Sequence, residues 1–361
     1  MAAREEGTGV HDDLTQRKSQ HLDLVQRPEV EPEGTDPLFG CVRLVHRALP
    51  ELSLDELDLR AELCGKKLDA PLMIVGMTGG TERAGQVNRD LAHLAQEAGV
   101  AFGVGSMRVL LDEPRLLPTF AVAPARPPLL MANLGAQQLV QRGPEAALKL
   151  IELLQADGIC IHLNAAQELV QSDGDRDFRG CLAAIGRLAQ ELGERLLVKE
   201  TGCGLSPVVV RELAANGVRA VDVSGTGGTS WPRVEQLRAK TSEGRELGGQ
   251  LSDWGIPTAA CVAGARQAAP QLRIIASGGI RDGFDAARAL ALGADAAGVA
   301  LPFVRAHQEG GIEAARQLLQ GFIASLKAAL LLSGARDVSA LRKTKPVVLE
   351  PLRSWIEGLL A

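Results

Sequence analysis

The chain has 361 residues, of which 46% are hydrophobic, so it can bury a large core without a disulfide or structural metal. The formal net charge is −5 with no long basic block, which argues against a dedicated nucleic-acid surface. The N-terminus carries no apolar signal segment, and no apolar run reaches membrane-spanning length. We therefore expect a soluble, cytoplasmic protein with no membrane partner.

Eight short apolar runs recur along the chain, with stretches of helical periodicity between them, such as 84–98 and 284–292. Near-continuous Val, Ile, Leu and Ala character is typical of parallel strands that are buried on both faces. The expected strands are 70–75, 100–104, 128–133, 158–162, 196–199, 219–223, 273–276 and 295–299.

Eight such units predict an α/β fold of the TIM (β/α)8 barrel type, spanning residues 70–335. A doubly wound sheet is the alternative, but its Gly-x-Gly-x-x-Gly turn after an early strand is missing. Residues 1–69 form an N-terminal extension and residues 336–361 a charged C-terminal tail. Residues 231–272, between strands six and seven, are too long for one helix and predict an insertion or lid over the barrel mouth.

The end of the fourth expected strand is crowded with polar side chains, namely His162, Asn164, Gln167 and Glu168. Polar groups in this position are costly unless they bind something, and barrel active sites form at this end. The alternative is that Asn164 caps the next helix and His162 is a satisfied core side chain. Glu168 is either an exposed helix acid or a ligand of Mg²⁺.

Glycine and polar residues also follow the other strands. Gly278 and Gly279 with Arg281 come after strand seven, where many TIM barrels bind a phosphate. Lys199 ends a buried strand, so its charge needs a partner, which is either the neighbouring Glu200 or the edge of a reduced flavin. Five further residues carry hydroxyl or amide groups that could bind a flavin: Thr78, Ser106, Asn133, Ser224 and Thr229. Taken singly, each is more typical of a cap or turn.

The six cysteines form no Cys-x-x-Cys pair and no zinc-binding spacing, so we expect reduced thiols. Cys203, which lies between two glycines, is the one candidate for a reactive thiol. A small cationic group from Arg17 to His21 is, by composition alone, solvated surface.

The sequence holds several distinctive motifs. They are Arg17-Lys18…His21, Met77-Thr78-Gly79-Gly80, Gly105-Ser106-Met107-Arg108, His-Leu-Asn-x-x-Gln-Glu from His162, Gly-Asp-Arg-Asp-Phe from Gly174, Lys-Glu-x-Gly-x-Gly from Lys199 and Gly-Gly-Thr-Ser-Trp ending at Trp231. In this order, from about Arg17 to the region of Trp355, the chain resembles the type 2 isopentenyl-diphosphate isomerases, which are FMN-dependent TIM-barrel enzymes.

The resemblance implies roles for individual residues. Contacts to the flavin ring and ribityl chain are implied for Gly76, Met77, Thr78, Ser106, Asn133, Lys199, Ser224 and Thr229. Contacts to the flavin phosphate are implied for Gly279, Ile280, Arg281, Ala300 and Leu301. Substrate contacts are implied for Arg17, Lys18, His21, Ser106, Met107, Arg108 and Gln167. Glu168 would bind Mg²⁺ at the diphosphate, and His162 and Gln167 would tune or orient the reacting groups.

The implied reaction converts isopentenyl diphosphate into dimethylallyl diphosphate with no net redox change. Its difficulty is the protonation of an unactivated alkene, for which ordinary side chains are too weakly acidic at neutral pH. Reduced FMN would act as the acid and base, NADPH would serve only to reduce it, and a homo-oligomer (tetramer or octamer) is implied. Three departures from the family pattern are Gly76 in place of Ala, Ser172-Asp173 in place of Pro-Glu, and Ser224 in place of Gly.

Three other functions are alternatives to this one. An FMN-dependent 2-hydroxyacid oxidase needs a late catalytic His followed closely by Gly, whereas the only histidine after Asn164 is His307, between Ala306 and Gln308. An enzyme like IMP dehydrogenase needs a nucleophilic cysteine, for which Cys203 is the only candidate. A non-enzymatic flavin-binding protein would not need the polar segment from His162 to Glu168.

Overall fold

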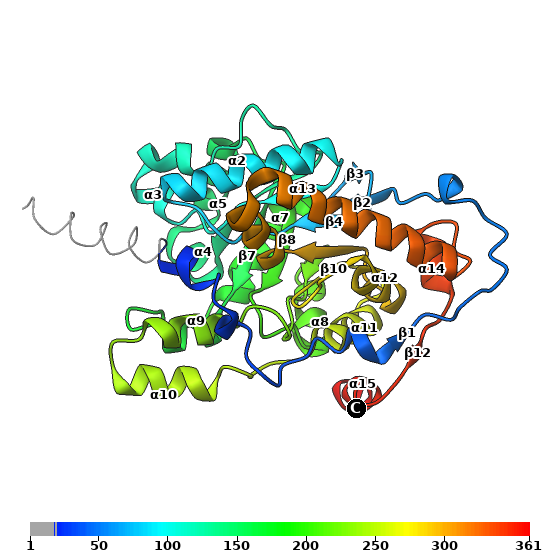
Figure 1. Ribbon diagram of the computed structural model, residues 1–361. Helices are drawn as coiled ribbons and strands as arrows, with labels where there is room; N and C mark the ends of the chain where they lie inside the picture. The colour runs from blue at the N-terminus through cyan, green and yellow to red at the C-terminus, as the bar shows by residue number, and fades with distance from the viewer. Residues whose placement is uncertain (1–17, 19) are drawn as a thin grey trace, which may run out of the picture.

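The centre of the computed structural model, which describes residue 18 and residues 20–361, is a closed barrel of parallel strands (Figure 1). The barrel confirms the expected TIM fold and excludes a doubly wound sheet, because an open sheet has two edges. The expected strands are all present, although their ends differ by a few residues. Around the barrel run β4 (Leu72–Ile74), β5 (Ala101–Gly103), β6 (Leu130–Gly135), β7 (Gly158–Leu163), β8 (Leu196–Glu200), β9 (Ala220–Asp222), β10 (Arg273–Ser277) and β11 (Ala296–Val299).

Helices surround the strands, and their ends follow local capping chemistry. The side chain of Thr81 accepts from the backbone N–H of Ala84 to begin α2, and Asp282 caps α12 in the same way. The long helix α13 is kinked at Gly310 and Gly311. The wall helices are α2 (Glu82–Glu97), α3 (Val109–Asp112), α4 (Ala136–Arg142), α5 (Pro144–Leu154), α6 (Ala165–Val170), α7 (Cys181–Leu192), α8 (Pro207–Ala215), α11 (Thr258–Ala268), α12 (Gly283–Leu292) and α13 (Leu301–Leu332).

The barrel interior is stacked in layers, because alternate residues of a strand face inward. One apolar layer takes a residue from every strand, and the hairpin of β2 (Ala61–Leu63) and β3 (Lys66–Leu68) packs against it with Leu63 and Leu68. This layer consists of Met73, Ala101, Met131, Cys160, Leu197, Ala220, Ile275 and Ala296. Two residues further along five of the strands, the inward positions become polar, and we call this set the polar layer: Asn133, His162, Lys199, Asp222 and Ser277.

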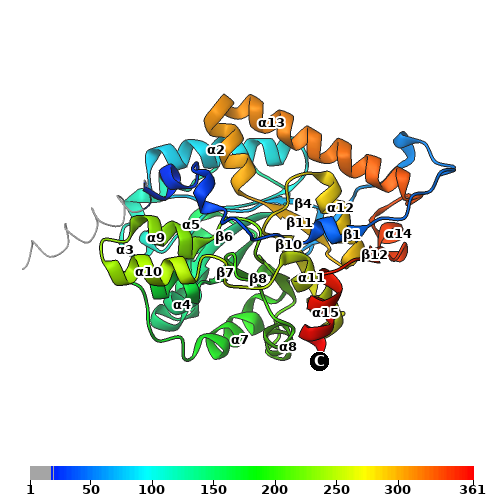
Figure 2. The same cartoon turned by 60° about the horizontal axis from the view of Figure 1, so that its bottom comes forward.

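The predicted insertion between the sixth and seventh barrel strands contains α9 (Trp231–Arg238) and α10 (Ser242–Gln250), which lie side by side next to the barrel (Figure 2). The chain then returns to the wall as α11. The N-terminal extension reaches this insertion, since the backbone N–H of Ser230 donates to the carbonyl of Val30 at 2.8 Å. Extension and insertion therefore meet above the carboxyl ends of the strands.

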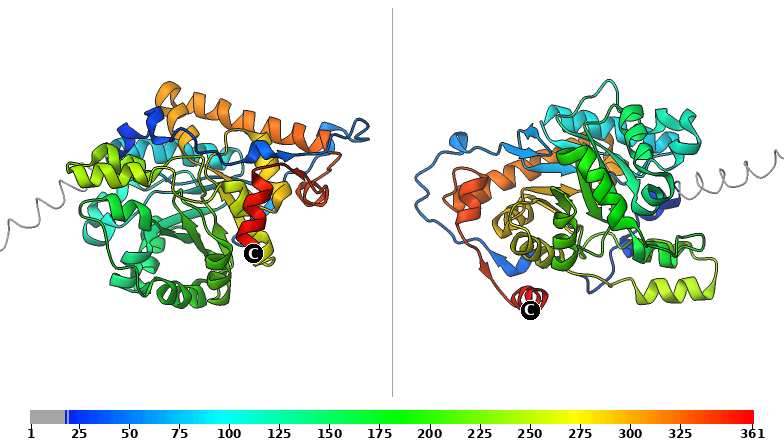
Figure 3. Two further views of the ribbon diagram at one scale, coloured as in Figure 1. Left: turned by 90° about the horizontal axis from the view of Figure 1, so that it is seen from below. Right: turned by 180° about the vertical axis from the view of Figure 1, so that it is seen from behind.

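The C-terminal tail is fastened to the outside of the barrel. It contains α14 (Val338–Lys343), β12 (Val347–Val348) and α15 (Leu352–Leu360). Strand β12 pairs antiparallel with β1 (Val42–Arg43) of the N-terminal extension, and α15 packs on α11 (Figure 3). Across the described residues, none of the helices combines the length and apolar character needed to cross a membrane.

Candidate active site

A cavity opens at the carboxyl ends of the barrel strands, and it gathers most of the residues singled out from the sequence. Arg17 lies outside the described residues. The side chain of Met107 is fully buried in the core and does not line the cavity, so the substrate contact expected at this residue stays a prediction. The expected residues that do line the cavity are Lys18, His21, Gly76, Met77, Thr78, Ser106, Arg108, Asn133, His162, Gln167, Glu168, Lys199, Ser224, Thr229, Gly279, Ile280, Arg281, Ala300 and Leu301.

His162 is held in its neutral form. Its Nδ1 donates to Oδ1 of Asn133 at 2.8 Å, which leaves Nε2 as a hydrogen-bond acceptor. Burial, helped by the positive charge of Lys199, lowers the pKa of His162 from 6.5 to about 3. His162 can therefore orient or accept, but it is not a proton donor at neutral pH.

The start of α6 is built around Glu168 rather than around a cap. The Nδ2 of Asn164 donates to Oε1 of Glu168 at 2.8 Å and to Oε1 of Gln167 at 3.2 Å, and its side chain makes no capping bond. The alternative of an Asn164 cap is thus wrong. Glu168 is only 8% exposed, which also excludes an exposed helix acid, and its Oε2 accepts from the backbone N–H of Asp175.

Buried polar atoms without partners are rare in folded proteins, and Oδ1 of Asn164 is one of them. It lies in a residue that lines the cavity beside Glu168. Within the described part of the chain, no group of three or more His, Cys, Asp or Glu side chains is placed to hold a metal. The arrangement fits Mg²⁺, which proteins hold through one or two carboxylates together with the phosphates of a substrate.

Lys199 is 7% exposed, and its ammonium donates to the backbone carbonyl of Glu200 at 2.6 Å. The carboxylate of Glu200 is occupied elsewhere, because it accepts backbone N–H groups of the following loop, including those of Thr201 and Gly202 at 2.6 Å. Burial raises the pKa of Glu200, and the N–H groups of Cys203, Gly202 and Gly204, together with the charge of Lys199, oppose that rise. Lys199, which lines the cavity, thus donates to the backbone of Glu200 and interacts with the Glu200 carboxylate only through its charge.

The glycine-rich loop after β10 lies between the end of that strand and the start of α12. Gly278 and Gly279 have φ of 98° and 77°, which L side chains rarely adopt. Arg281 follows and forms an ion pair with Glu31 of the N-terminal extension, which also binds Arg305 of α13. Backbone N–H groups, a helix start and an arginine in one place suit a phosphate group.

The N-terminal extension brings two basic side chains, Lys18 and His21, to the cavity. Lys18 donates to the carbonyl of Ser106 at 2.9 Å, and Nε2 of His21 lies 3.0 Å from Oε1 of Glu235 in α9. Burial would raise the pKa of Glu235, but His21, Arg238 and Gln167 together lower it to about 2. Glu235 was missed in the sequence, where it reads as an ordinary acid of the insertion four residues after Trp231.

Of the departures from the family pattern, Gly76 has a local physical cause, whereas Ser224 lies where the backbone favours glycine. A Cβ atom on Gly76 would lie 2.1 Å from the carbonyl oxygen of Val104, so this backbone has no room for alanine. Ser224 has φ of 39°, the left-handed conformation in which glycine is more comfortable. Both residues line the cavity, and at Ser224 the backbone is strained.

The residues on which the alternative functions depend are poorly placed for them. His307 binds Asp90 at 2.8 Å, and neither lines the cavity. Burial, followed by the charge of Glu200, raises the pKa of the Cys203 thiol, which opposes a nucleophilic role. The six cysteines are all free thiols.

The chain was compared with known proteins. Residues 162–347 match the family model described as FMN-dependent dehydrogenase. An isopentenyl-diphosphate delta-isomerase of Ignicoccus hospitalis is 44% identical over 350 residues, covering 95% of this chain and 96% of the relative. A protein of the same name from Synechococcus sp. is 47% identical over 341 residues, covering 94% and 97%.

Solved structures with the same fold include a lactate oxidase of Pediococcus acidilactici, with a TM-score of 0.65 and 15% identity, covering 94% of each chain. A mandelate oxidase mutant with an FMN adduct has a TM-score of 0.60 and 15% identity, covering 95% of this chain and 96% of its own. At such identities the likeness shows the fold alone.

Proposed function

The chain belongs to the family of isopentenyl-diphosphate delta-isomerases and to the FMN-dependent dehydrogenase family, and we propose that it converts isopentenyl diphosphate into dimethylallyl diphosphate with reduced FMN. One observation carries the proposal: the same cavity is lined by Asn133, His162, Lys199, Gln167 and Glu168. Asn133 and Lys199 suit a flavin, whereas Gln167 and Glu168 suit a substrate diphosphate and its metal ion.

The cavity fits FMN in its chemistry. Lys199 provides a cation for the N1–C2=O edge of the ring, and the loop from Gly279 to Arg281 provides donors for the phosphate. When bound and reduced, FMN supplies an N5 proton for the alkene and an electron-rich ring that stabilises the cation. Further flavin contacts are proposed for Gly76, Met77, Thr78, Ser106, Asn133, Ser224, Thr229, Ala300 and Leu301.

The remaining side chains bind and orient the substrate. Lys18, His21 and Arg108 bring positive charge to the diphosphate, and Glu168 holds Mg²⁺ against it. Gln167 donates to Glu235 at 3.0 Å, which fixes the orientation of its amide beside the substrate. His162 stays neutral and orients rather than protonates. Fixing the alkene in one position lowers the entropic barrier to proton transfer.

Water is kept from the reacting carbons by an apolar cluster above the cavity. Met77 and Trp231 line the cavity and pack against buried side chains of the N-terminal extension, α2, α9 and α13. The cationic intermediate of the reaction would otherwise be captured by water. Those buried side chains are Leu22, Leu24, Val25, Val30, Ala84, Val234, Leu301 and Val304.

We also propose that residues 1–69 serve the barrel of residues 70–335 by contributing substrate contacts, Arg17 among them, while residues 336–361 form a tail. NADPH as reductant, Mg²⁺, a tetramer or octamer and a cytoplasmic location are further parts of the proposal. The sequence resemblance supports these parts, and six free thiols are in keeping with a reducing compartment.

One assay tests the proposed function. The purified chain is incubated without oxygen with FMN, NADPH, Mg²⁺ and isopentenyl diphosphate, and the diphosphates are separated and identified. We expect dimethylallyl diphosphate with FMN and none without it, and absence of product in the complete mixture contradicts the proposal. A parallel incubation of the oxidised holoprotein with lactate or mandelate tests the oxidase alternative, for which we expect no bleaching of the flavin.

A further inference from the structure

The polar layer of the barrel contains one acid, Asp222, which the functions above do not use. Its neighbours Asn133, His162, Lys199 and Ser277 line the cavity, whereas Asp222 is 0% exposed. Asp222 of β9 is the direct Cα partner of Lys199 of β8 in the strand register. The acid therefore lies behind the wall against which the flavin is proposed to bind.

The contacts of Asp222 are few for a fully buried carboxylate. Its Oδ1 accepts from the hydroxyl of Ser277 at 2.6 Å, and its Oδ2 has no hydrogen-bond partner among the described residues. Burial raises the pKa of Asp222. The ammonium of Lys199 is the largest of the influences that oppose this rise, followed by hydrogen bonds from the Ser277 hydroxyl and from the backbone of Ser224 and Ser277. A buried carboxylate that is half satisfied costs stability, so its presence calls for an explanation.

The structure assigns Asp222 as the counter-charge of Lys199, a positioning residue that reduces the positive potential which Lys199 presents to bound FMN. The assignment rests on the FMN binding of the proposed function. Without Asp222, an unbalanced ammonium would stabilise the negative charge of the reduced ring and favour the reduced over the oxidised flavin. Because the proposed reaction uses the flavin as an acid and base, this balance of charge sets how readily the ring gives up a proton.

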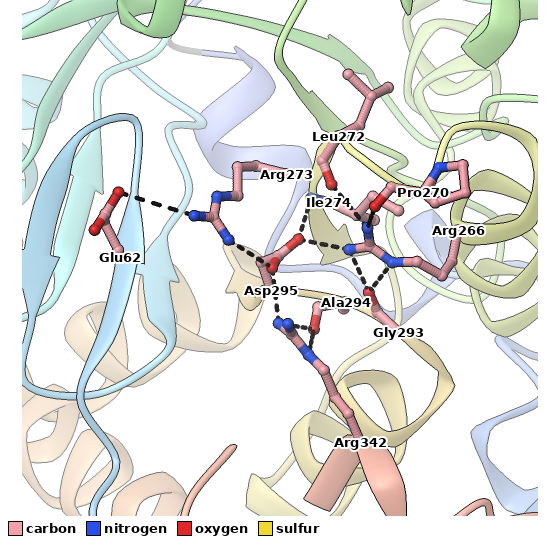
Figure 4. Close-up of polar contacts among 10 residues, drawn as sticks. All are labelled: Glu62, Arg266, Pro270, Leu272, Arg273, Ile274, Gly293, Ala294, Asp295 and Arg342. Atoms are coloured by element: carbon pink, nitrogen blue, oxygen red, sulfur yellow. Dashed lines mark hydrogen bonds and ion pairs between the residues drawn. The ribbon is translucent and has the colours of Figure 1, made fainter. Parts of the chain in front are cut away.

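A matched control exists at the other end of the same barrel, where Asp295 precedes β11. Asp295 is also buried, but it binds Arg266 at 2.7 Å, Arg342 at 2.8 Å and Arg273 at 3.4 Å (Figure 4). Its Oδ2 also accepts from the backbone N–H of Ile274 at 2.8 Å. Substituting Asp295 removes a buried negative charge from the barrel without touching the polar layer.

The test is the midpoint potential of bound FMN, measured by anaerobic reduction against a reference dye in wild type, Asp222→Asn and Asp295→Asn. In Asp222→Asn we expect reduced FMN to bind about tenfold more tightly relative to oxidised FMN, which corresponds to a rise of about 30 mV for a two-electron couple. Asp295→Asn keeps the wild-type potential. An unchanged potential in Asp222→Asn overturns the assignment.

A second pair of variants tests whether Asp222 acts through Lys199. In a Lys199→Met background, Asp222 loses its counter-charge and becomes protonated, so adding Asp222→Asn should leave the potential unchanged. If Asp222→Asn raises the midpoint potential as much in the Lys199→Met background as in the chain with Lys199, Asp222 acts directly on the flavin, and the assignment is overturned. Circular dichroism confirms folding, and Asp222→Ser replaces Asp222→Asn if that variant does not fold. A wild-type chain that binds no FMN contradicts the proposed function, whereas FMN-loaded proteins of equal potential contradict only the role of Asp222.

Discussion

The two ends of the barrel each contain a buried aspartate, and the two aspartates differ in how many partners they have. At the amino ends of the strands, Asp295 is surrounded by arginines from β10, α11 and α14, and both of its carboxylate oxygens are bound. At the carboxyl ends, Oδ1 of Asp222 accepts from the Ser277 hydroxyl, whereas its Oδ2 has no hydrogen-bond partner among the described residues. At the amino end, the buried negative charge is paired with positive charges, which stabilises the fold. At the carboxyl end, some buried polar groups lack protein partners within the described part of the chain, as is expected where a ligand binds.

The largest expected effect is the loss of stability in Asp295→Ala. Removing one partner of a buried ion pair leaves the others uncompensated, so we expect the free energy of unfolding to fall by about 3 kcal/mol. Urea denaturation followed by far-UV circular dichroism measures the fall. Asp222→Asn should cost less, about 1.5 kcal/mol, because the amide Oδ1 still accepts from Ser277 and the ammonium of Lys199, although it loses a counter-charge, keeps the carbonyl of Glu200 as its partner. A larger loss in Asp222→Asn than in Asp295→Ala contradicts the comparison of the two ends.

The next effect concerns ligand binding at the carboxyl end. Glu168→Gln removes the one carboxylate proposed for Mg²⁺, so we expect the affinity for Mg²⁺ in the presence of isopentenyl diphosphate to fall by at least about tenfold. Isothermal titration calorimetry measures this affinity. The flavin absorbance of the purified variant should match wild type, because Glu168 has no proposed contact with FMN. Loss of flavin would mean that Glu168 has been assigned to the wrong ligand.

A third prediction concerns pH. The folded chain keeps His162 neutral with a pKa of about 3, whereas the unfolded imidazole takes up its proton near pH 6.5. The unfolded state therefore binds more protons as the pH falls from about 6.5 toward 3, and His162 reduces stability over that range by up to about 1.4 kcal/mol per pH unit. Partial exposure to the cavity makes the observed slope smaller. His162→Gln should flatten the dependence of unfolding free energy on pH, and an unaltered slope contradicts the assignment of a neutral histidine.

The smallest effect is expected at Ser224, whose φ of 39° strains a residue with a side chain. Ser224→Gly should relieve this strain and raise the free energy of unfolding by about 1 kcal/mol, as measured by urea denaturation. Ala276→Gly in the neighbouring β10 provides a contrast, because a glycine inside a regular strand destabilises. Destabilisation by both substitutions would show that the serine hydroxyl matters more than the backbone strain.

Much of the fold was predictable from the sequence because its signals are local. Buried parallel strands produce continuous apolar runs, and caps such as Asp282 mark where helices begin. The helices of the insertion were not resolved individually, since α9 and α10 lack a strong apolar face of their own and depend on packing against each other.

The candidate site was predictable where motifs are compact and obscure where contacts are long-range. The segment from His162 to Glu168 carries its chemistry in seven residues. The role of Glu235, by contrast, depends on a contact with His21, which lies 214 positions away in the sequence. Asp222 was visible as an acid in an apolar run, yet only the barrel register places it opposite Lys199. Met107 shares a motif with Ser106 and Arg108, but its apolar side chain turns into the core instead.

In the proposed function, the chain moves a double bond by flavin acid–base chemistry without net redox change. The most direct measurement is the number of dimethylallyl diphosphate molecules formed per NADPH consumed, under anaerobic conditions with a limiting amount of NADPH. We predict many product molecules for each NADPH, because reduction only prepares the flavin. One NADPH consumed for every product, or product formed with no flavin reduced at all, would contradict it.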